Sequence, residues 1–442
     1  MVVKNTFASF TILIALVLGG FACKDNPPQP PSGIISWNFT IEDIGVKEIW
    51  LRLKYPSSPL YQSLSITRND RSDTIFHLQV NESNFLLPDT IIRDDLSLLP
   101  KHQYVYTALA EKNLGRQIIT ERLVLTVTTM DTTTHNIIWK VDTLGDGNSS
   151  TLWDVAILSD TEAYAVGEIY KKDSTGQFNI DPYNFVKWDG KQWFMQSITY
   201  VPLGAVYAFS GHDIWVGSSA PYHWDGSSWR AFNVQGIFNG YINKIWGTSS
   251  SDLYIVGTNG SIGHYDGQKW QKIESGTVFH FQDIFGAESK SGNLEIYVVG
   301  VQEYPPDRAL LSVKSGVVTS ISTSPIGPLE QLFSIWFIPE RHYYVIGDGV
   351  YEKTSISDST WSNGPFDITR FGLTKIRGSG LNDVFIAGAF GECLHWNGNS
   401  WKSYKAQTGL TNGSYSGISV VQHLVIAVGG SESKAIIATG RK

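Results

Sequence analysis

Three histidines are the first residues whose type and spacing suggest a site. His223, His264 and His395 each directly precede the first aromatic residue of a six-residue signature that recurs along the chain. Imidazole is the commonest side-chain metal ligand, so such a set could bind a metal ion. Residues at the same position of successive repeats are, however, separated by whole structural units, whose strands lie about 4.8 Å apart. We therefore predict that these histidines are structural and that the chain has no metal site.

Two insertions carry the residues that we predict to bind a partner. One follows Gly167 in the first repeat and the other follows Gly300 in the fourth repeat, so both should emerge on the same face. Loops on a rigid scaffold often carry binding groups, and Tyr and Arg dominate many interfaces. The alternative is that both are variable loops without a ligand. The predicted binding residues are Tyr170, Lys171, Lys172, Tyr304, Asp307 and Arg308.

No catalytic residue is predicted. The sequence has no phosphate-cradling Gly-Lys-Ser/Thr loop, no Gly-x-Ser-x-Gly elbow and no His-Glu-x-x-His zinc motif, so no cofactor is expected. The arginines between residues 136 and 442 stand in unrelated contexts. The many Asp and Glu residues leave a carboxylate pair of the glycosidase type open as an alternative.

The elements that position these residues are built from the recurring signature, which reads aromatic, Asp or Asn, Gly, two variable residues, Trp. Asp-Gly and Asn-Gly between apolar runs predict a β-hairpin whose two-residue turn has positive φ at both central positions. We expect the aromatic residues to pack between repeats, with sugar stacking as the alternative. The signature occurs at Trp188–Trp193, Trp224–Trp229, Tyr265–Trp270 and Trp396–Trp401.

A second pattern, an apolar run ending in Gly, recurs through the same region. From Gly167 to Gly429 it spans 262 residues in six intervals, a period of about 44 residues. Each unit reads as three strands plus a fourth that starts at the last Trp of the hairpin. Short antiparallel strands repeated seven times predict a seven-bladed β-propeller over residues 135–442.

The two ends of this region predict how the ring closes. His135–Asp142 reads as a fourth strand without the first three, and the last repeat stops after a third strand at Ala435–Ala438. We expect the first segment to complete the last blade and so remove an open edge. The repeats resemble the bacterial propeller superfamily of WD-repeat-like, kelch-like and quinoprotein-like proteins, although the hairpin motif is neither the WD dipeptide nor the sialidase Asp-box.

The N-terminal segment resembles a bacterial lipoprotein signal. Residues 1–22 contain Lys4 and an apolar run of about 16 residues, which is short for a membrane span and typical of a signal peptide. The resemblance implies that Cys23 is lipidated, that residues 23–32 form a Pro-rich tether, and that the protein is an outer-membrane lipoprotein, periplasmic or surface-exposed. Cleavage without lipidation and an uncleaved anchor helix are the alternatives.

Residues 33–131 predict an immunoglobulin-like sandwich, because short alternating runs are divided by Asn, Asp, Ser and Pro clusters. The segment Leu96–Tyr106 resembles the fibronectin type III pattern that leads into a tyrosine corner, and Trp50 suits the buried tryptophan of that family. The resemblance implies a spacer or binding module. An immunoglobulin-like sandwich of other topology is the alternative.

The composition agrees with an all-β protein: 42 glycines and 13% aromatic residues accompany only 17% charged residues. The net charge of −7 gives no indication of a basic surface that could bind nucleic acid. We expect the protein to contact the membrane only through the lipid. We therefore expect a monomeric, non-catalytic binding or scaffold module of the cell envelope, with a protein or glycan partner on the propeller face. The alternatives are a propeller-type polysaccharide lyase or glycoside hydrolase and an assembly factor for envelope complexes.

Overall fold

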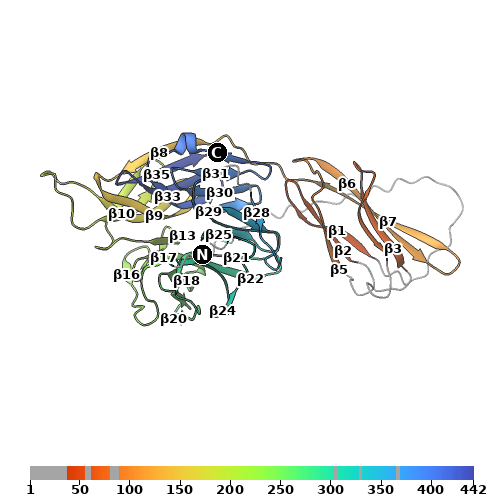
Figure 1. The fold of residues 1–442 in the computed structure, drawn as a ribbon, viewed down its shortest axis with the longest axis horizontal. Coiled ribbons are helices and arrows are strands. Elements are labelled where there is room, and N and C mark those ends of the chain that lie inside the picture. The colour runs from red at the N-terminus through yellow and green to blue at the C-terminus, as the bar shows by residue number, and fades with distance from the viewer. Residues whose placement is uncertain are drawn as a thin grey trace.

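The computed structural model describes residues 37–54, 61–79, 89–302, 304, 307–327, 331–364 and 369–442. The predicted signal peptide, Cys23 and the Pro-rich tether lie outside these residues. Figure 1 shows a small two-sheet body beside a larger body of repeated sheets. Within the described ranges the chain is all-β apart from one short helix, α1 (Lys405–Thr408), and it contains no helix long and apolar enough to cross a membrane.

The small body is a sandwich of a three-stranded sheet, ordered β1-β2-β5, and a four-stranded sheet, ordered β4-β3-β6-β7. Alternating residues of both sheets point inward and form one core that includes Leu51, Ile66 and Tyr106. This core explains the period-two pattern of the sequence. The strands are β1 (Asn38–Ile44), β2 (Ile49–Lys54), β3 (Tyr61–Arg68), β4 (Thr74–Gln79), β5 (Asp89–Asp94), β6 (Gln103–Asn113) and β7 (Ile118–Thr128).

Two aromatic residues of the sandwich can be compared with their predicted roles. The hydroxyl of Tyr104, at the start of β6, accepts a hydrogen bond of 2.8 Å from the backbone N–H of Leu99, five residues upstream. The expectation that Trp50 is a core residue was wrong: it faces outward from β2, where the guanidinium of Arg341 lies 4.6 Å from its ring. Trp50 faces outward because its neighbours Ile49 and Leu51 take the inward positions of β2. Trp37 is buried in the core instead.

The larger body consists of four-stranded antiparallel sheets, seven in the described part of the chain. Five of them follow one another as strands β13–β32, and β9–β12 precede these. The strands are β9 (Gly147–Ser159), β10 (Glu162–Tyr170), β11 (Tyr183–Trp188), β12 (Trp193–Gln196), β13 (Ala205–Ser210), β14 (Asp213–Gly217), β15 (Pro221–Trp224), β16 (Trp229–Ala231), β17 (Ile242–Ser249), β18 (Asp252–Gly257), β19 (Ile262–Tyr265), β20 (Trp270–Ile273), β21 (His280–Glu288), β22 (Leu294–Gln302), β23 (Asp307–Lys314), β24 (Val317–Ser320), β25 (Leu332–Ile338), β26 (His342–Gly347), β27 (Val350–Lys353), β28 (Ser362–Asn363), β29 (Leu373–Gly380), β30 (Asp383–Gly388), β31 (Cys393–Trp396) and β32 (Trp401–Ser403).

The last sheet is completed by a strand from the other end of the region. It is ordered β33-β34-β35-β8, with β8 (Ile138–Leu144), β33 (Ser414–Val421), β34 (Leu424–Ser431) and β35 (Lys434–Arg441). Thr143 pairs with Ile436 and Trp139 with Gly440, which confirms the pairing predicted between these two segments. The first strand of each sheet contacts the first strand of the next, and β33 contacts β9, so the first strands surround a common axis.

The recurring glycine at the end of each second strand is explained by a close approach of two backbones. A Cβ on Gly257 would lie 1.8 Å from the carbonyl oxygen of Tyr241, and one on Gly347 would lie 1.9 Å from that of Gln331. Each oxygen belongs to the residue just before the first strand of the same sheet. Because real Cβ contacts are never this short, only glycine fits at these positions.

The signature hairpins form as predicted, but the predicted turn type was wrong. In the first sheet Trp188 pairs with Trp193, so four residues close the turn, and only Gly190 has positive φ. The carboxylate of Asp189 accepts hydrogen bonds from the backbone N–H groups of Lys191 and Gln192, each of 2.8 Å. Asp therefore acts as a cap with ordinary φ, which the predicted turn, with positive φ at both central positions, would not allow.

The sandwich contacts the turns that join first to second strands in the repeated sheets. Asp43 accepts hydrogen bonds from the guanidinium of Arg341 at 2.6 Å, and it lies 3.0 Å from the Nζ of Lys290. The side-chain amide of Asn382 donates to the carbonyl of Asp131 in the connecting segment at 2.9 Å. These turns all lie at one edge of their sheets, so the sandwich approaches from that side.

Candidate functional site

The histidines of the signature each bind an acid within their own sheet. The Nε2 atom of His223 lies 2.8 Å from Asp213, and that of His264 lies 2.7 Å from Asp252. Each ring also stacks on an aromatic residue of the second strand; His223 lies 4.3 Å from Trp215. His395 repeats the arrangement with Asp383 and Phe385. Each ring therefore ties a third strand to a second strand, the structural role that we predicted.

The first insertion extends β10 and folds back on its own sheet. The hydroxyl of Tyr170 donates to Glu168 at 3.0 Å, and the Nζ of Lys171 lies 3.2 Å from Asp146. The Nζ of Lys172 lies 5.1 Å from the ring centre of Phe178, within the same loop. These predicted binding residues are thus brought together. Tyr170 and Lys172 have partners within the insertion, whereas the partner of Lys171, Asp146, lies in the turn between β8 and β9.

The second insertion is a hairpin tip between β22 and β23, where Gln302 pairs with Asp307. Tyr304 is 91% exposed at this tip. Arg308 is placed differently from what we expected of a binding residue: its guanidinium donates to the Oγ1 of Thr323 at 3.2 Å and to the carbonyl of Ile326 at 2.7 Å. Arg308 holds a neighbouring loop, whereas Tyr304 is available to a partner.

A cavity of about 480 Å³ opens at one end of the axis that the first strands surround. We call it the mouth. Its wall includes Trp153, Gly204, Asn243, Phe333 and Ser416, and all of these except Trp153 stand just before a first strand or within its first three residues. First strands begin at the edge where second strands end, so the mouth lies on the side away from the turns that contact the sandwich.

The floor of the mouth is a buried layer of charged side chains. The Nζ of Lys244 lies 2.6 Å from Asp154, a contact that joins the third sheet to the first across the axis. Asp283 accepts two hydrogen bonds from Arg377, of 2.7 and 2.8 Å, which join the fourth sheet to the sixth. The Nζ of Lys375 lies 3.5 Å from Asp283 and lines the mouth.

Burial and charge oppose each other in this layer. Burial would raise the pKa of Asp283, but the positive charges of Arg377 and Lys375 hold it below its ordinary value. Burial lowers the pKa of Lys375 to about 8, and the attraction of Asp283 limits the fall. Neutral pH lies above the pKa of Asp283 and below that of Lys375, so both of these groups are charged there.

Large apolar side chains are exposed at the edge of the sheets where the mouth opens. Connections from second to third strands, and from fourth strands to the next sheet, reach the same edge because the strands are antiparallel. Six exposed apolar residues lie in such connections, and Trp153 lines the mouth itself. We call this side of the molecule the open face. The residues are Trp153, Ile180, Tyr200, Tyr241, Val278, Tyr304 and Phe390.

The sequence-based interpretation missed the charged layer and the residues around the mouth. A signal was present: first strands are apolar runs, yet Asp154, Lys244, Asp283, Lys375 and Arg377 interrupt them. Charged residues inside buried repeats have to be paired, so they point to contacts between sheets. Among the residues that the structure describes, no three His, Cys, Asp or Glu side chains are placed to hold a metal ion.

Comparison with known proteins identifies the class of fold. No family model matches the chain, and no curated protein matches it. Among solved structures, three similar chains match this protein over 95–98% of their own length and over 68–69% of this chain. These chains are β-propellers, and the repeated four-stranded sheets of this protein therefore have the β-propeller fold.

Three of these structures illustrate the likeness. YCF48 bound to a D1 peptide has a TM-score of 0.52 and 16% identity, covering 69% of this chain and 97% of that one. YCF48 from Cyanidioschyzon merolae has a TM-score of 0.51 and 13% identity, covering 69% and 98%. The WD40 β-propeller domain of Doa1 has a TM-score of 0.50 and 11% identity, covering 68% and 95%. At identities this low, the structural similarity establishes the fold alone. The function has to be argued from the residues of this protein.

Proposed function

We propose that this protein is a non-catalytic binding module that docks a protein partner on the open face. The supporting observation is that exposed apolar residues, including Tyr241 and Tyr304, lie in connections at the edge of the sheets where the mouth opens. Soluble proteins expose large apolar patches chiefly where they bind something. The sandwich contacts the opposite side of the sheets, so it leaves this face open to a partner.

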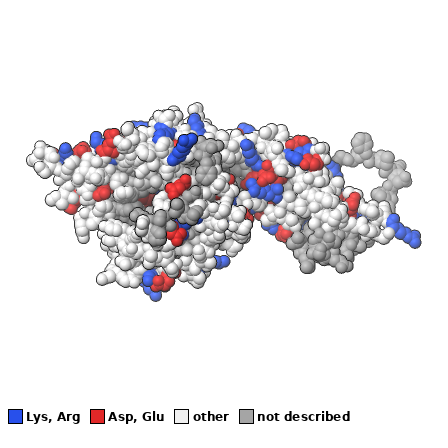
Figure 2. All heavy atoms as spheres, in the orientation of Figure 1, with Lys and Arg blue, Asp and Glu red and all other residues white. Residues whose placement is uncertain are grey.

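Two features of the similar structures and of the surface favour a protein over other partners. One similar propeller is described as bound to a D1 peptide, so a propeller of similar fold can bind a peptide. Figure 2 shows Lys and Arg intermixed with Asp and Glu among a majority of other residues, rather than a field of one sign. Nucleic-acid binding needs such a basic field. A glycan partner on the same face is the second candidate that the exposed aromatic residues support.

Within this proposal the repeated sheets are the seven blades of one closed propeller, and residues 33–131 are a fibronectin type III-like spacer. The sheet count, the contact of β33 with β9 and the pairing of β8 with β35 support the first point. The strand orders β1-β2-β5 and β4-β3-β6-β7, with the Tyr104–Leu99 bond at the start of β6, support the second.

An enzymatic role of the lyase or hydrolase type is less well supported by the mouth. Its wall carries one carboxylate, Glu168, whereas glycoside hydrolysis uses a pair. The buried carboxylates below it, Asp154 and Asp283, are engaged by Lys244 and Arg377. A role in assembling envelope complexes agrees with protein docking and would appear as capture of several subunits.

We also propose that Cys23 is lipidated and anchors the protein in the outer membrane. The support is the leader sequence, since several acyl chains hold a protein stably at a bilayer. A Cys23→Ala variant should move to the soluble fraction after cell disruption. Retention in the membrane fraction at the level of the parent protein would contradict this anchor.

The docking proposal is tested by paired variants on opposite sides of the sheets. Tyr241→Ser with Tyr304→Ser removes two exposed rings from the open face, whereas Val317→Ser removes an apolar residue that is 65% exposed at the other edge. Partner capture from cell-envelope extracts should fall about tenfold or more for the first variant, equivalent to about 1.4 kcal/mol. The second should bind as the parent does. Equal capture by both, with unchanged melting temperatures, would contradict docking on this face.

A further inference from the structure

The charged layer under the mouth has more positive than negative groups. Lys244, Lys375 and Arg377 contribute three cations, and Asp154 and Asp283 contribute two carboxylates. Asp154 is occupied by Lys244 and by the backbone N–H of Val206, and Asp283 is occupied by Arg377. The layer therefore carries one positive charge beyond its carboxylates.

The excess charge is located at Lys375. Its Nζ donates to the backbone carbonyl of Gln282 at 3.1 Å and lies 3.5 Å from Asp283, which is longer than the contacts that Asp283 makes with Arg377. Lys375 is only 7% exposed, and that exposure is toward the mouth. A buried ammonium with incomplete compensation gains free energy from an anion placed beside it.

The walls above Lys375 combine large apolar side chains with polar ones such as Asn243, Thr374 and Ser416. Trp153, Phe333 and Tyr241 line the mouth together with Ile242, and they leave about 480 Å³ between them. Such a volume is within the range of cavities that hold a side chain or a small organic molecule. Glu168 also lines the mouth, and its carboxylate accepts a hydrogen bond of 3.0 Å from the hydroxyl of Tyr170. An anionic group is thus repelled by Glu168 and attracted by Lys375 at the floor.

We propose that the mouth binds a ligand consisting of an apolar group that ends in a carboxylate, with the carboxylate on the Nζ of Lys375 and the apolar group against Trp153 and Phe333. Such a ligand is the free C-terminus of a chain with an apolar last residue, or a small aromatic carboxylate. The inference rests on the proposed docking function, because the mouth opens on the open face. It adds the chemical group that the centre of that face recognises.

The test compares ligands that differ only in charge. An immobilised decapeptide library with apolar last residues is prepared with free carboxylates and, separately, with amidated ends. The full-length protein should bind the free-carboxylate pool at least tenfold more strongly. In solution, 3-phenylpropionate should bind and 3-phenylpropanamide should not, as measured by calorimetry. Binding of the small acid alone, with no preference between peptide pools, would assign the site to small carboxylates and keep the proposal.

Variants then identify the cation. Lys375→Met should abolish the preference for the carboxylate, Lys375→Arg should keep it, and Lys272→Met, which removes an exposed lysine of β20, should leave it unchanged. If Lys375→Met does not fold, the parent protein decides, because its affinity for 3-phenylpropionate should weaken as the pH rises through about 8.

The inference would be overturned if the parent protein bound the acid and amide forms equally, both for the peptide pools and for 3-phenylpropionate and 3-phenylpropanamide. So would a carboxylate preference that persists in a folded Lys375→Met protein. Either result could coexist with partner capture that still depends on Tyr241 and Tyr304, in which case the docking proposal stands and only the recognition of a carboxylate fails. Loss of dependence on both tyrosines would contradict the docking proposal itself.

Discussion

Asp283 shows how a single residue can organise the centre of this protein. Its carboxylate is fully buried, and it accepts hydrogen bonds from Arg377 and from the hydroxyl of Ser334. These partners come from β29 and β25, so one side chain of β21 connects three first strands. A buried charge with several partners stabilises an arrangement strongly only while all partners remain, because each would otherwise be left uncompensated.

We predict that Asp283→Asn destabilises the protein by about 3–5 kcal/mol, since Arg377 and Lys375 would lose their counter-charge in a buried place. Urea unfolding followed by tryptophan fluorescence measures the change. Asp181→Asn, which alters an exposed carboxylate of the first insertion, is the control and should change the free energy of unfolding by less than about 0.5 kcal/mol. A small effect at Asp283 would show that the layer is hydrated rather than buried.

At the scale of elements, β8 determines whether the ring has an open edge. It is the outermost strand of its sheet and pairs only with β35 on its inner side. Successive N–H groups of a strand point in opposite directions, so those of Lys140 and Val141 differ: one faces β35 and the other faces outward. Proline, which has no N–H, is tolerated only at the outward position of an edge strand.

Single proline substitutions at these two positions should therefore have unequal effects. One of Lys140→Pro and Val141→Pro should cost about 1–3 kcal/mol through a lost ladder hydrogen bond, and the other should cost much less. Thermal unfolding by circular dichroism measures both. Deletion of residues 135–142 should be more severe and cause aggregation, because it exposes the edge of β35. Two prolines of equal and small effect would mean that this strand contributes little.

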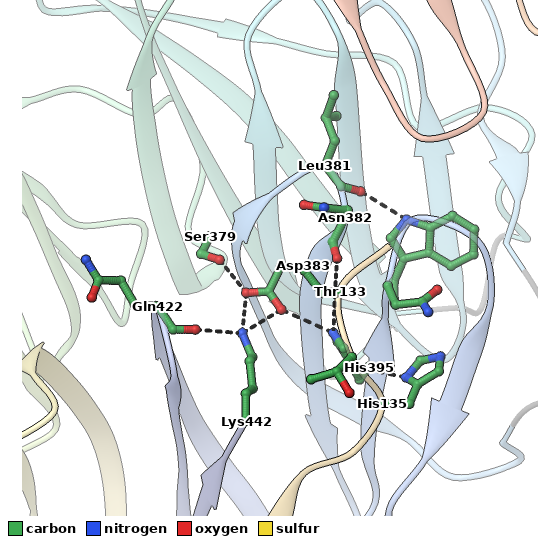
Figure 3. A network of polar contacts seen from close by, with 12 residues as sticks. Thr133, His135, Ser379, Leu381, Asn382, Asp383, His395, Gln422 and Lys442 are labelled. Carbon is green, nitrogen blue, oxygen red and sulfur yellow. Dashed lines mark hydrogen bonds and ion pairs between the residues drawn. The ribbon is translucent and has the colours of Figure 1, made fainter. Parts of the chain in front are cut away.

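The segment that leads from the sandwich to β8 is held by a chain of polar contacts. Figure 3 shows Asp383 between Lys442, at 2.6 Å, and His395, at 3.1 Å, with His135 beside His395. The two Nδ1 atoms of the histidines lie 3.0 Å apart, so one must donate and the other accept. At least one neutral ring satisfies this arrangement, whereas protonation of both rings would place two N–H groups face to face.

This contact predicts a pH dependence. Burial lowers the pKa of His135, helped by the charges of His395 and Lys402, and burial also lowers that of His395 despite the attraction of Asp383. A lowered pKa in the docked state means that docking is favoured above the pKa of a free imidazole, about 6.5, and weakens as the pH falls below it. The segment should be held at neutral pH and released in acid.

Hydrogen exchange measures this release. The backbone N–H of Thr133 donates to the carbonyl of Asn397 at 3.2 Å, and its protection factor, corrected for the intrinsic rate, should fall about tenfold from pH 7.5 to pH 5. His135→Gln should remove most of the pH dependence, because an amide can turn either its oxygen or its nitrogen toward His395. A variant as sensitive to pH as the parent would exclude this histidine pair as the cause.

At the scale of the whole molecule, the orientation of the sandwich depends on a few charged contacts. Arg341 is almost fully buried between Asp43, Glu42 and the ring of Trp50. Lys290 reaches the same Asp43 from the neighbouring sheet but is largely exposed. Buried, hydrogen-bonded pairs matter more than exposed ones, which are screened by solvent.

We expect Arg341→Gln to free the sandwich from the sheets, and Lys290→Gln to have little effect. Small-angle X-ray scattering should show a larger maximum dimension for the first variant only. The melting temperature of the repeated sheets should stay within about 2 °C of the parent, because the contact lies outside their core. An unchanged scattering profile would mean that the connecting segment alone sets the orientation.

Much of this fold was predictable because repetition makes the signal redundant. The recurring glycine, the hairpin signature and the incomplete repeats at both ends each gave correct strands and pairings, since local turns and steric limits determine them. Contacts between repeats were not predictable, because they depend on which residues face the axis. Lys375 and Trp50 illustrate this: their partners, Asp283 and Arg341, come from distant parts of the chain.

The pairing of β8 with β35 has a consequence for how the chain is made. Ile138 and Lys434, which begin the two strands, are 296 residues apart in sequence. At ribosomal speeds of about 5–20 residues per second, β8 would wait roughly 15–60 s before its only neighbour is synthesised. During that time the N–H and C=O groups of β8 are unpaired, and the edge of another nascent sheet could pair with them. Correct completion of this sheet therefore requires that β8 stay unpaired until β35 is synthesised, a task that in cells falls to chaperones.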